Sequence, residues 1–211
     1  MLRGPASRAV KSGDIFRSMC IRFLAVLLVC ASLRAEAQQT PTRIGRVLEG
    51  AYQQIGKTTI YDGTYRRLSF PGGDVPLERG VCTDVVVRAY RHAGLDLQVL
   101  VNQDMTRSFH AYPQLWGLSR PDSNIDHRRV PNLAAFFKRH GTTLPISARA
   151  SDYAAGDIVT WLLSSGVPHI GFVADRREGG RPLIIHNIGA GARTEDVLFS
   201  YSITGHYRYD P

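Results

Sequence analysis

Apolar residues recur at helical spacing in four segments of the first 140 residues. The helices predicted from this spacing cover residues 42–56, 81–94, 97–109 and 132–140. Glycine stands at or just after the end of the first, second and fourth segments, where a helix commonly terminates. A polar loop rich in glycine and proline, residues 61–80, separates the first two helices.

The pattern changes after residue 155 to short runs rich in β-branched and aromatic residues, separated by turns. These predicted strands cover residues 157–163, 169–175, 183–188 and 202–209. Helices followed by an antiparallel meander are typical of an α+β domain in which a small sheet packs on the preceding helices. We therefore expect a single domain of that class.

The N-terminal segment has the pattern of an export signal. The apolar run over residues 23–33 is too short to span a bilayer as a helix. Basic residues precede it, and Ala35-Glu36-Ala37 follows as a cleavage pattern. We expect a signal peptide over residues 1–37, a mature domain over 38–211, and a periplasmic or secreted protein with no transmembrane segment after cleavage. A membrane-anchoring N-terminus is the alternative, and a start at Met19 would give a more compact signal.

Composition and charge narrow the classes of partner. Of the 211 residues, 44% are apolar and 21% are charged, which is ordinary for a globular protein. The net charge is +8, but residues 1–37 supply half of it, and the remaining +4 is spread without a Lys/Arg block. Nucleic-acid binding is therefore not indicated. The charge supports only a modest attraction to an anionic polymer or to an envelope surface, and we expect a monomer.

Cleavage of the signal would leave Cys82 as the one cysteine, so no internal disulfide can form. Cys82 falls at the start of the second predicted helix, where free N–H groups and the helix dipole stabilise a thiolate. The alternative is a small buried residue with an inert thiol. His169 and His186 lie in successive predicted strands and become neighbours on one face if these strands pair antiparallel. Each histidine alone is more typical of a structural role, whereas the three residues together indicate catalysis.

Several motifs carry a family resemblance. They are Tyr61-Asp62-Gly63, residues 80–84, residues 124–129 and His186-Asn187-Ile188-Gly189. Together they resemble an exported bacterial family filed as domain of unknown function 1287. Over roughly residues 45–190 the chain also resembles the NlpC-type cell-wall cysteine peptidases, which have a papain-like fold.

The NlpC-type resemblance implies a role for each matching residue. Cys82 corresponds to the nucleophile, His169 to the base and His186 to the residue that orients the base. Tyr61 corresponds to a tyrosine near the oxyanion site. If the phase of the predicted strand over residues 183–188 is shifted by one residue, Asn187 replaces His186 as the third member.

The sequence departs from the NlpC-type pattern beside the nucleophile. That pattern reads Asp-Cys-Ser-Gly, whereas this chain has Val81-Cys82-Thr83-Asp84. Asp84 could cap the helix, contact substrate or oppose formation of the thiolate.

A polar run over residues 124–129 has three interpretations. It could be a solvated loop, or it could bind a substrate carboxylate, because arginine holds carboxylates bidentately. In the second interpretation Arg128 or Arg129 contacts the substrate, and Asp126 belongs to the same binding region. In the third, His127, next to Asp126, serves as a third member or a metal ligand.

The favoured hypothesis is a cysteine amidohydrolase or peptidase that cleaves an amide bond in peptidoglycan stem peptides and needs no cofactor. Cys82 would attack the carbonyl, His169 would take the thiol proton as a thiolate–imidazolium pair forms, and an acyl-enzyme would result. An acyltransferase with the same triad and a non-catalytic envelope-binding module are the alternatives. A zinc site built from Cys82, His169 and His186 is less favoured, because the chain lacks closely spaced ligand pairs.

Overall fold

The computed structural model describes Met1 and residues 42–211. Except for Met1, the predicted signal peptide therefore lies outside the described residues. No helix in the described part of the chain is long and apolar enough to cross a membrane. The α-helices between residues 42 and 211 are α2 (Arg43–Tyr52), α3 (Cys82–His92), α4 (Leu97–Ser108) and α5 (Val130–His140).

A six-stranded antiparallel sheet follows the helices, with strand order β3-β8-β4-β5-β6-β7. Its strands are β3 (Thr142–Thr143), β4 (Ile158–Leu162), β5 (Pro168–Glu178), β6 (Arg181–His186), β7 (Arg193–Glu195) and β8 (Ser202–Arg208). Two short strands, β1 (Ile60–Tyr61) and β2 (Arg79–Gly80), form a separate parallel pair at the two ends of the long loop. Short 3₁₀ turns cover Phe109–Ala111, Asp126–Arg128 and Ala150–Asp152.

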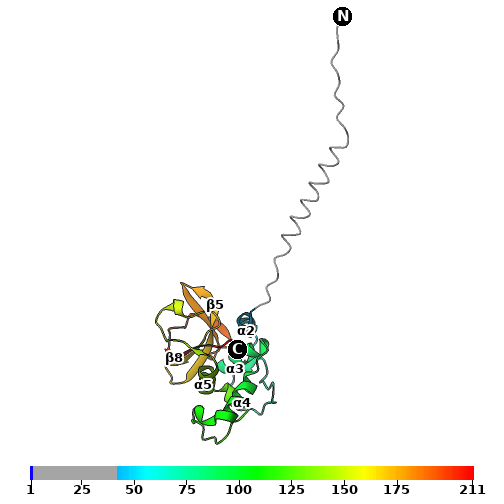
Figure 1. Ribbon diagram of the computed structural model, residues 1–211, viewed down its shortest axis with the longest axis vertical. Coiled ribbons are helices and arrows are strands. Elements are labelled where there is room, and N and C mark those ends of the chain that lie inside the picture. Colours follow the sequence, from blue (N-terminus) through cyan, green and yellow to red (C-terminus); the bar gives the residue numbers. More distant parts are fainter. Residues whose placement is uncertain (2–41) are drawn as a thin grey trace. The chain divides into compact units, whose positions relative to one another are not determined.

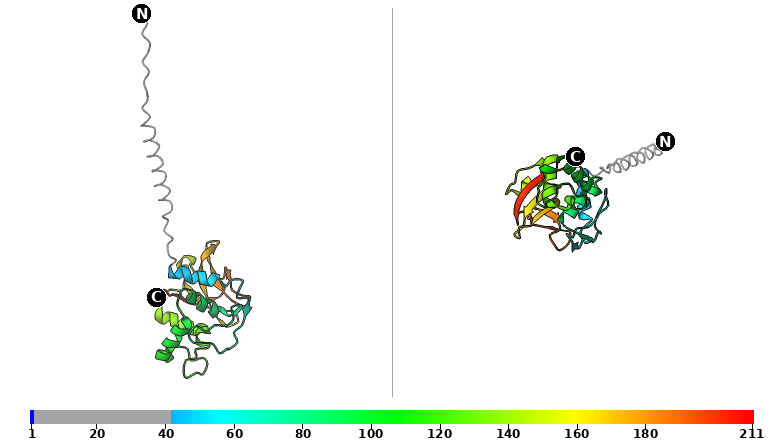
Figure 2. Two further views of the ribbon diagram at one scale, coloured as in Figure 1. Left: turned by 90° about the vertical axis from the view of Figure 1, so that its right-hand side faces the viewer. Right: turned by 90° about the horizontal axis from the view of Figure 1, so that it is seen from below.

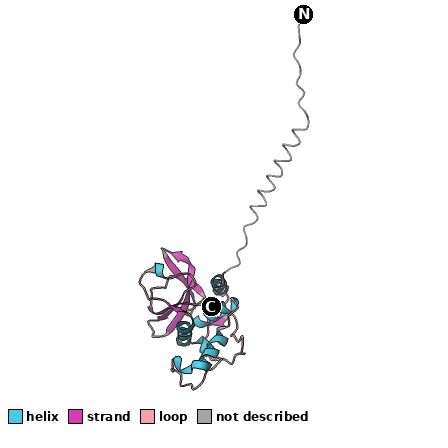
Figure 3. Cartoon of the chain, viewed as in Figure 1, coloured by secondary structure: helices cyan, strands magenta, loops and turns pink. Residues whose placement is uncertain are grey.

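Within residues 42–211 the long helices lie mainly to one side of the six-stranded sheet (Figure 1; Figure 3), and Figure 2 shows the same part of the chain from two further directions. Successive side chains of the central strands point to opposite faces of the sheet, and both faces are apolar. One face, with Ile170 and Phe172, joins the main core formed with the helices. The other face, with Val159 and Val173, belongs to a smaller core closed by Tyr153, which precedes β4, and Leu198, which follows β7.

The predicted α+β class is confirmed, as are the four helices and four strands, with some shifts of their ends. The predicted meander holds only in part. Strands β4 to β7 follow one another in order, but β8 returns to pair with β4 on the other side. Strands β3 and β7 were not predicted, because runs of two or three residues are too short to show a pattern. Ile55 lies beyond the end of α2 and is 38% exposed, so it is not part of the apolar helix face.

Close approach of α2 and α3 requires a glycine. A Cβ atom at Gly50 would lie 2.5 Å from the His92 Cβ and 3.1 Å from the Ala89 Cα, so no larger residue fits without moving one helix. The buried residues Val47 and Ala51 of α2 then pack into the main core beside α3. This contact fixes α3, which carries Cys82 at its start.

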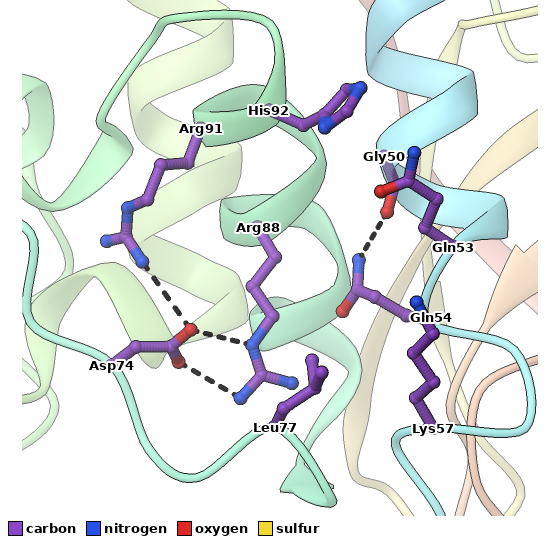
Figure 4. A pocket seen from close by; sticks show the side chains of 9 residues that line it. All are labelled: Gly50, Gln53, Gln54, Lys57, Asp74, Leu77, Arg88, Arg91 and His92. Carbon is purple, nitrogen blue, oxygen red and sulfur yellow. Dashed lines mark hydrogen bonds and ion pairs between the residues drawn. The ribbon is translucent and has the colours of Figure 1, made fainter.

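Arg88 holds the long loop against α3. Its guanidinium forms two hydrogen bonds with Asp74, of 2.8 and 3.0 Å, and also donates to Thr58 Oγ1 and to backbone carbonyls of the loop, including that of Arg79. Figure 4 shows Asp74 held between Arg88 and Arg91. Because Tyr61 and Cys82 lie at the two ends of this loop, Arg88 helps to bring them together.

We predict that Arg88→Gln lowers the free energy of unfolding by about 3 kcal/mol, because breaking a buried charge pair typically costs about 3–5 kcal/mol and Asp74 is partly exposed. Urea unfolding of the purified protein measures this loss. The matched control is Arg149→Gln, whose arginine side chain is 79% exposed in its pair with Asp152. That change should cost less than about 1 kcal/mol. Equal losses in both variants would contradict the role given to Arg88.

Candidate active site

Cys82 is the first residue of α3, as the sequence predicted, and only 4% of its surface is exposed. Asp84, in the first turn of the helix, accepts a hydrogen bond of 2.7 Å from the Val81 backbone N–H. This bond closes the turn that precedes the nucleophile position, and an acidic residue there also interacts favourably with the helix dipole. Of the three roles considered for Asp84, this contact shows helix capping, and the nearby carboxylate also opposes formation of the Cys82 thiolate.

A buried ion pair joins Asp84 to Arg128. The guanidinium donates two hydrogen bonds to the carboxylate, of 2.8 and 2.9 Å, and both side chains are almost fully buried. Arg128 also donates to the backbone carbonyls of Asp62 and Thr64, and Thr83 Oγ1 donates to the Arg128 carbonyl. The expectation that Asp84 contacts substrate is corrected, since its carboxylate is engaged inside the protein. The guanidinium of Arg128 is likewise occupied by internal partners.

The environment of the Cys82 thiol favours its neutral form. Burial is the main cause that raises its pKa, to about 11, and the nearby Asp84 carboxylate raises it further. Hydrogen bonds from the backbone of Ile170 and Thr83 and from the Tyr61 hydroxyl act in the opposite direction. Burial of Tyr61 raises the pKa of its own hydroxyl, with the neighbouring Cys82 as the second cause, so this group remains a donor at neutral pH.

His169 and His186 meet on the face of the sheet that carries Val173 and Ile184, opposite the face that packs on the helices. His169 lies near the start of β5 and His186 ends β6, with 2.8 Å between His169 Nε2 and His186 Nδ1. The β5–β6 register pairs Phe172 with Ile185, which places Gly171 opposite His186. A Cβ at Gly171 would lie 3.0 Å from that of His186, so the glycine leaves room for the contact.

Burial is the main cause that lowers the pKa of His169, to about 3, and the neighbouring His186 lowers it further. Both rings are therefore neutral at neutral pH, since burial also lowers the pKa of His186. Together with the raised pKa of Cys82, this favours a neutral thiol and a neutral imidazole in the resting protein over a preformed thiolate–imidazolium pair. The described residues show no hydrogen bond between the Cys82 thiol and His169, but the thiol contacts the backbone of the next residue, Ile170.

One residue of this cluster was missed by sequence reasoning. Glu195 lies on β7, next to β6, and its Oε2 is 2.8 Å from His186 Nε2. The chain of contacts thus runs across three adjacent strands, from His169 through His186 to Glu195. The segment around Glu195 gave no strand signal, so the sequence could not align it with the histidines.

A hollow of about 400 Å³ opens beside Cys82, and Tyr61 lies on its wall. Most of its other walls are apolar, formed by Val81, Leu115, Trp116, Ile125, Val130, Pro131 and Pro168. Arg129 also lines the hollow. Its guanidinium lies 3.9 Å from the centre of the Trp116 ring and donates a 3.0 Å hydrogen bond to Asp126. Arg128, which is paired with Asp84, also lines the cavity, and the cavity can therefore hold an apolar group next to Arg129.

The remaining candidate residues, Asp126, His127 and Asn187, are buried inside the protein. Asp126 is 1% exposed and accepts from the Asp122 backbone, so it does not face the hollow. His127 is 2% exposed and contacts neither strand histidine. Asn187 donates to the Gly80 carbonyl, 3.0 Å away, and His186 is the residue that contacts His169. No group of three or more His, Cys, Asp or Glu within residues 42–211 is placed to hold a metal ion.

The fold and site define an α+β protein with a cysteine at a helix start and a histidine pair on the adjoining sheet. The chain belongs to the family described as "Domain of unknown function (DUF1287)", whose model matches residues 48–209. It is 60% identical over 164 residues to a protein of Escherichia coli (strain K12) described as "Uncharacterized protein YijF", and the match covers 77% of this chain and 80% of that protein.

Two solved structures are similar at 15% sequence identity. NlpC1 from Trichomonas vaginalis matches 77% of this chain with a TM-score of 0.40. A protein similar to an NLP/P60-family lipoprotein, from Staphylococcus aureus, matches 82% with a TM-score of 0.41. In both cases the match covers 44% of the other chain, so this chain spans less than half of their length.

We predict that Cys82 alkylates slowly with iodoacetamide at pH 7 and that its rate rises roughly tenfold per pH unit up to about pH 10. Below its pKa a thiol gains that factor in thiolate for each unit, and burial holds the pKa of Cys82 near 11. Peptide mapping of the labelled full-length protein follows Cys82 separately from the other cysteines. The control is the same protein unfolded in urea, where the rate should level off near pH 9. A plateau near pH 7 in the folded protein would refute the neutral resting thiol.

Proposed function

We propose that this protein is an exported cysteine amidohydrolase that cleaves an amide bond in peptidoglycan stem peptides, with Cys82 as nucleophile, His169 as base and His186 as the residue that orients the base. One observation carries the proposal. Cys82, at the start of α3, contacts the backbone directly after His169, and the His169 ring is held by His186. The order of elements is also the one expected from the NlpC-type resemblance.

The first step transfers a proton as the new bond forms. Because the resting thiol and the imidazole are both neutral, the Cys82 proton moves to His169 while Sγ attacks the amide carbonyl. His169 Nε2 faces His186, which leaves Nδ1 to take this proton. The carbonyl oxygen gains the negative charge, and the Tyr61 hydroxyl and backbone N–H groups at the start of α3 stabilise it.

The second half of the reaction returns the enzyme to its resting state. The carbon–nitrogen bond breaks, and His169 gives its proton to the departing amine, which leaves an acyl-enzyme on Cys82. His169 then takes a proton from water as the water oxygen attacks the thioester. The carboxylic acid is released when the proton returns to the Cys82 sulfur.

The hollow beside Cys82 supports a peptide substrate with a carboxylate. Its apolar wall suits aliphatic parts of a short peptide, and Arg129 at its edge offers a cation fixed over Trp116. Arginine recognises carboxylates by paired hydrogen bonds, and stem peptides carry such groups. The signal-peptide pattern and the net +4 of residues 38–211 favour an anionic polymer of the envelope as the source.

The raised pKa of Cys82 favours a second candidate, a non-catalytic envelope-binding module on the same scaffold. Such a module would bind peptidoglycan through the hollow with an inert thiol. An acyltransferase differs from the hydrolase only in the acceptor that attacks the acyl-enzyme. The product mass separates the three, since binding alone yields no product and acyl transfer adds the mass of the acceptor instead of that of water.

We predict that the wild-type protein releases soluble fragments from purified peptidoglycan and that Cys82→Ala releases none. His169→Ala should lose a factor of ~10²–10⁴, the usual contribution of a general base. His186→Gln should be impaired but measurable. Mass spectrometry of the released fragments gives the rates and identifies the bond cleaved.

Asn187→Ala serves as the control for strand phase. It removes the contact to the Gly80 carbonyl but leaves both histidines in place, so we expect lower stability and a milder loss of turnover than in His186→Gln. Equal digestion by wild type and Cys82→Ala would end the hydrolase proposal. A silent His186→Gln beside a damaging Asn187→Ala would move the third position to Asn187.

We predict that Arg129→Gln raises KM for a carboxylate-bearing stem peptide by roughly tenfold, with little change in kcat, because a charged hydrogen bond in binding contributes about 1.5–3 kcal/mol. For a substrate in which that carboxylate is amidated, the KM of the variant should equal that of the wild type. Arg149→Gln, on an exposed side chain, is the matched control. An unchanged KM for the acidic peptide would show that Arg129 does not bind the carboxylate.

A further inference from the structure

We infer that Glu195 is a positioning residue that fixes, through His186, which ring nitrogen of His169 is free to accept a proton. The inference rests on the proposed function of this site and extends it to a fourth residue on a third strand. Two hydrogen bonds of 2.8 Å carry it, one between His169 Nε2 and His186 Nδ1 and one between His186 Nε2 and Glu195 Oε2.

The direction of each hydrogen bond follows from the chemistry of the groups. A carboxylate accepts hydrogen bonds and donates none, so His186 Nε2 carries a proton and donates to Glu195. A neutral imidazole has a proton on one nitrogen, which makes His186 Nδ1 an acceptor. His169 Nε2 must then be the donor in the bond between the rings. The proton of a neutral His169 is thereby placed on Nε2, and Nδ1 keeps its lone pair.

Without Glu195 this assignment is lost. His186 could then carry its proton on Nδ1 and donate to His169 Nε2, which would put the proton of His169 on Nδ1. That tautomer has no free electron pair on the nitrogen left to receive the Cys82 proton. A misplaced tautomer of this kind is a known cause of large rate losses in catalytic triads.

The sheet places the three side chains in reach of one another. The β6–β7 register pairs Ile184 with Glu195 and His186 with Arg193. Residues 184 and 186 share a face, so Glu195 lies diagonally across from His186, within reach of a long side chain. His186 is fully buried, whereas the Glu195 side chain is 33% exposed and has Arg193 Nη1 at 3.6 Å from its other oxygen. The carboxylate thus keeps contact with water while it holds a buried ring.

Glu195 also stabilises the charge that forms during the reaction. When His169 takes the Cys82 proton it becomes an imidazolium, buried at a position where its pKa is low. A carboxylate two rings away offsets that positive charge without contact with the substrate. Its removal should therefore lower kcat and leave KM nearly unchanged.

The test compares Glu195→Leu and Glu195→Gln with wild type in the full-length protein. Leucine removes the acceptor, whereas glutamine keeps a carbonyl oxygen that can still accept from His186 Nε2. Glu178→Gln is the matched control, since Glu178 lies on β5 with an exposed side chain and has no contact with either histidine. Urea unfolding identifies any variant that fails to fold.

The direct readout is the tautomer of each ring, from long-range ¹H–¹⁵N spectra of ¹⁵N-histidine-labelled protein, assigned with His169→Gln and His186→Gln. In wild type, Glu195→Gln and Glu178→Gln we expect both His169 and His186 to be protonated on Nε2. In Glu195→Leu we expect a substantial share of both rings to be protonated on Nδ1. Wild-type tautomers in Glu195→Leu would overturn the inference.

The second readout is turnover of peptidoglycan. We expect kcat to fall about 10–100-fold in Glu195→Leu, as is usual when the partner that orients a functional histidine is removed, with much of it restored in Glu195→Gln. A full kcat in Glu195→Leu would also overturn the inference. If the wild type releases no fragment, the proposed function fails, while the tautomer spectra still decide whether Glu195 fixes the ring protons.

Discussion

The buried pair of Asp84 and Arg128 is the interaction on which the site depends. Asp84 caps the turn that begins α3, and Arg128 binds the same carboxylate and the backbone of the long loop. Two segments distant in the sequence, the loop near Tyr61 and the turn before α5, are thereby fixed against the helix start. Two desolvated charges are stable only as a pair, and loss of one partner typically costs about 3–5 kcal/mol. The pair therefore ties both segments to the turn that carries Cys82.

The same burial sets the electrostatics of the site. Excluding water from Cys82 and His169 raises the pKa of the thiol and lowers that of the imidazole, so the neutral forms are favoured before substrate arrives. The hydrogen bonds to the thiol work against this cost at Cys82, and the Glu195 carboxylate works against it at His186. Chemistry at such a site requires the proton to move together with bond formation, since separate charges are too costly there.

Much of the fold was predictable because its elements are long and periodic. The four helices, the principal strands and the α+β class follow from spacing alone, and Cys82 at a helix start follows from the end of the loop and the onset of periodicity. The short strands β3 and β7 have no such signal. Their formation depends on the neighbouring strands that pair with them, and Glu195 was missed with β7. The order of β8 beside β4 likewise depends on tertiary packing.

The sequence by itself determined the class of fold, the family, and the candidates Cys82, His169 and His186, because local periodicity and residue chemistry are written along the chain. Only the tertiary structure decided the partners of these residues. It showed that Asp84 faces Arg128, that His186 rather than Asn187 contacts His169, and that Arg129 lies over Trp116 at the hollow. The physical reason is that strand register and the burial of charge depend on contacts between segments far apart in sequence, which no local pattern specifies.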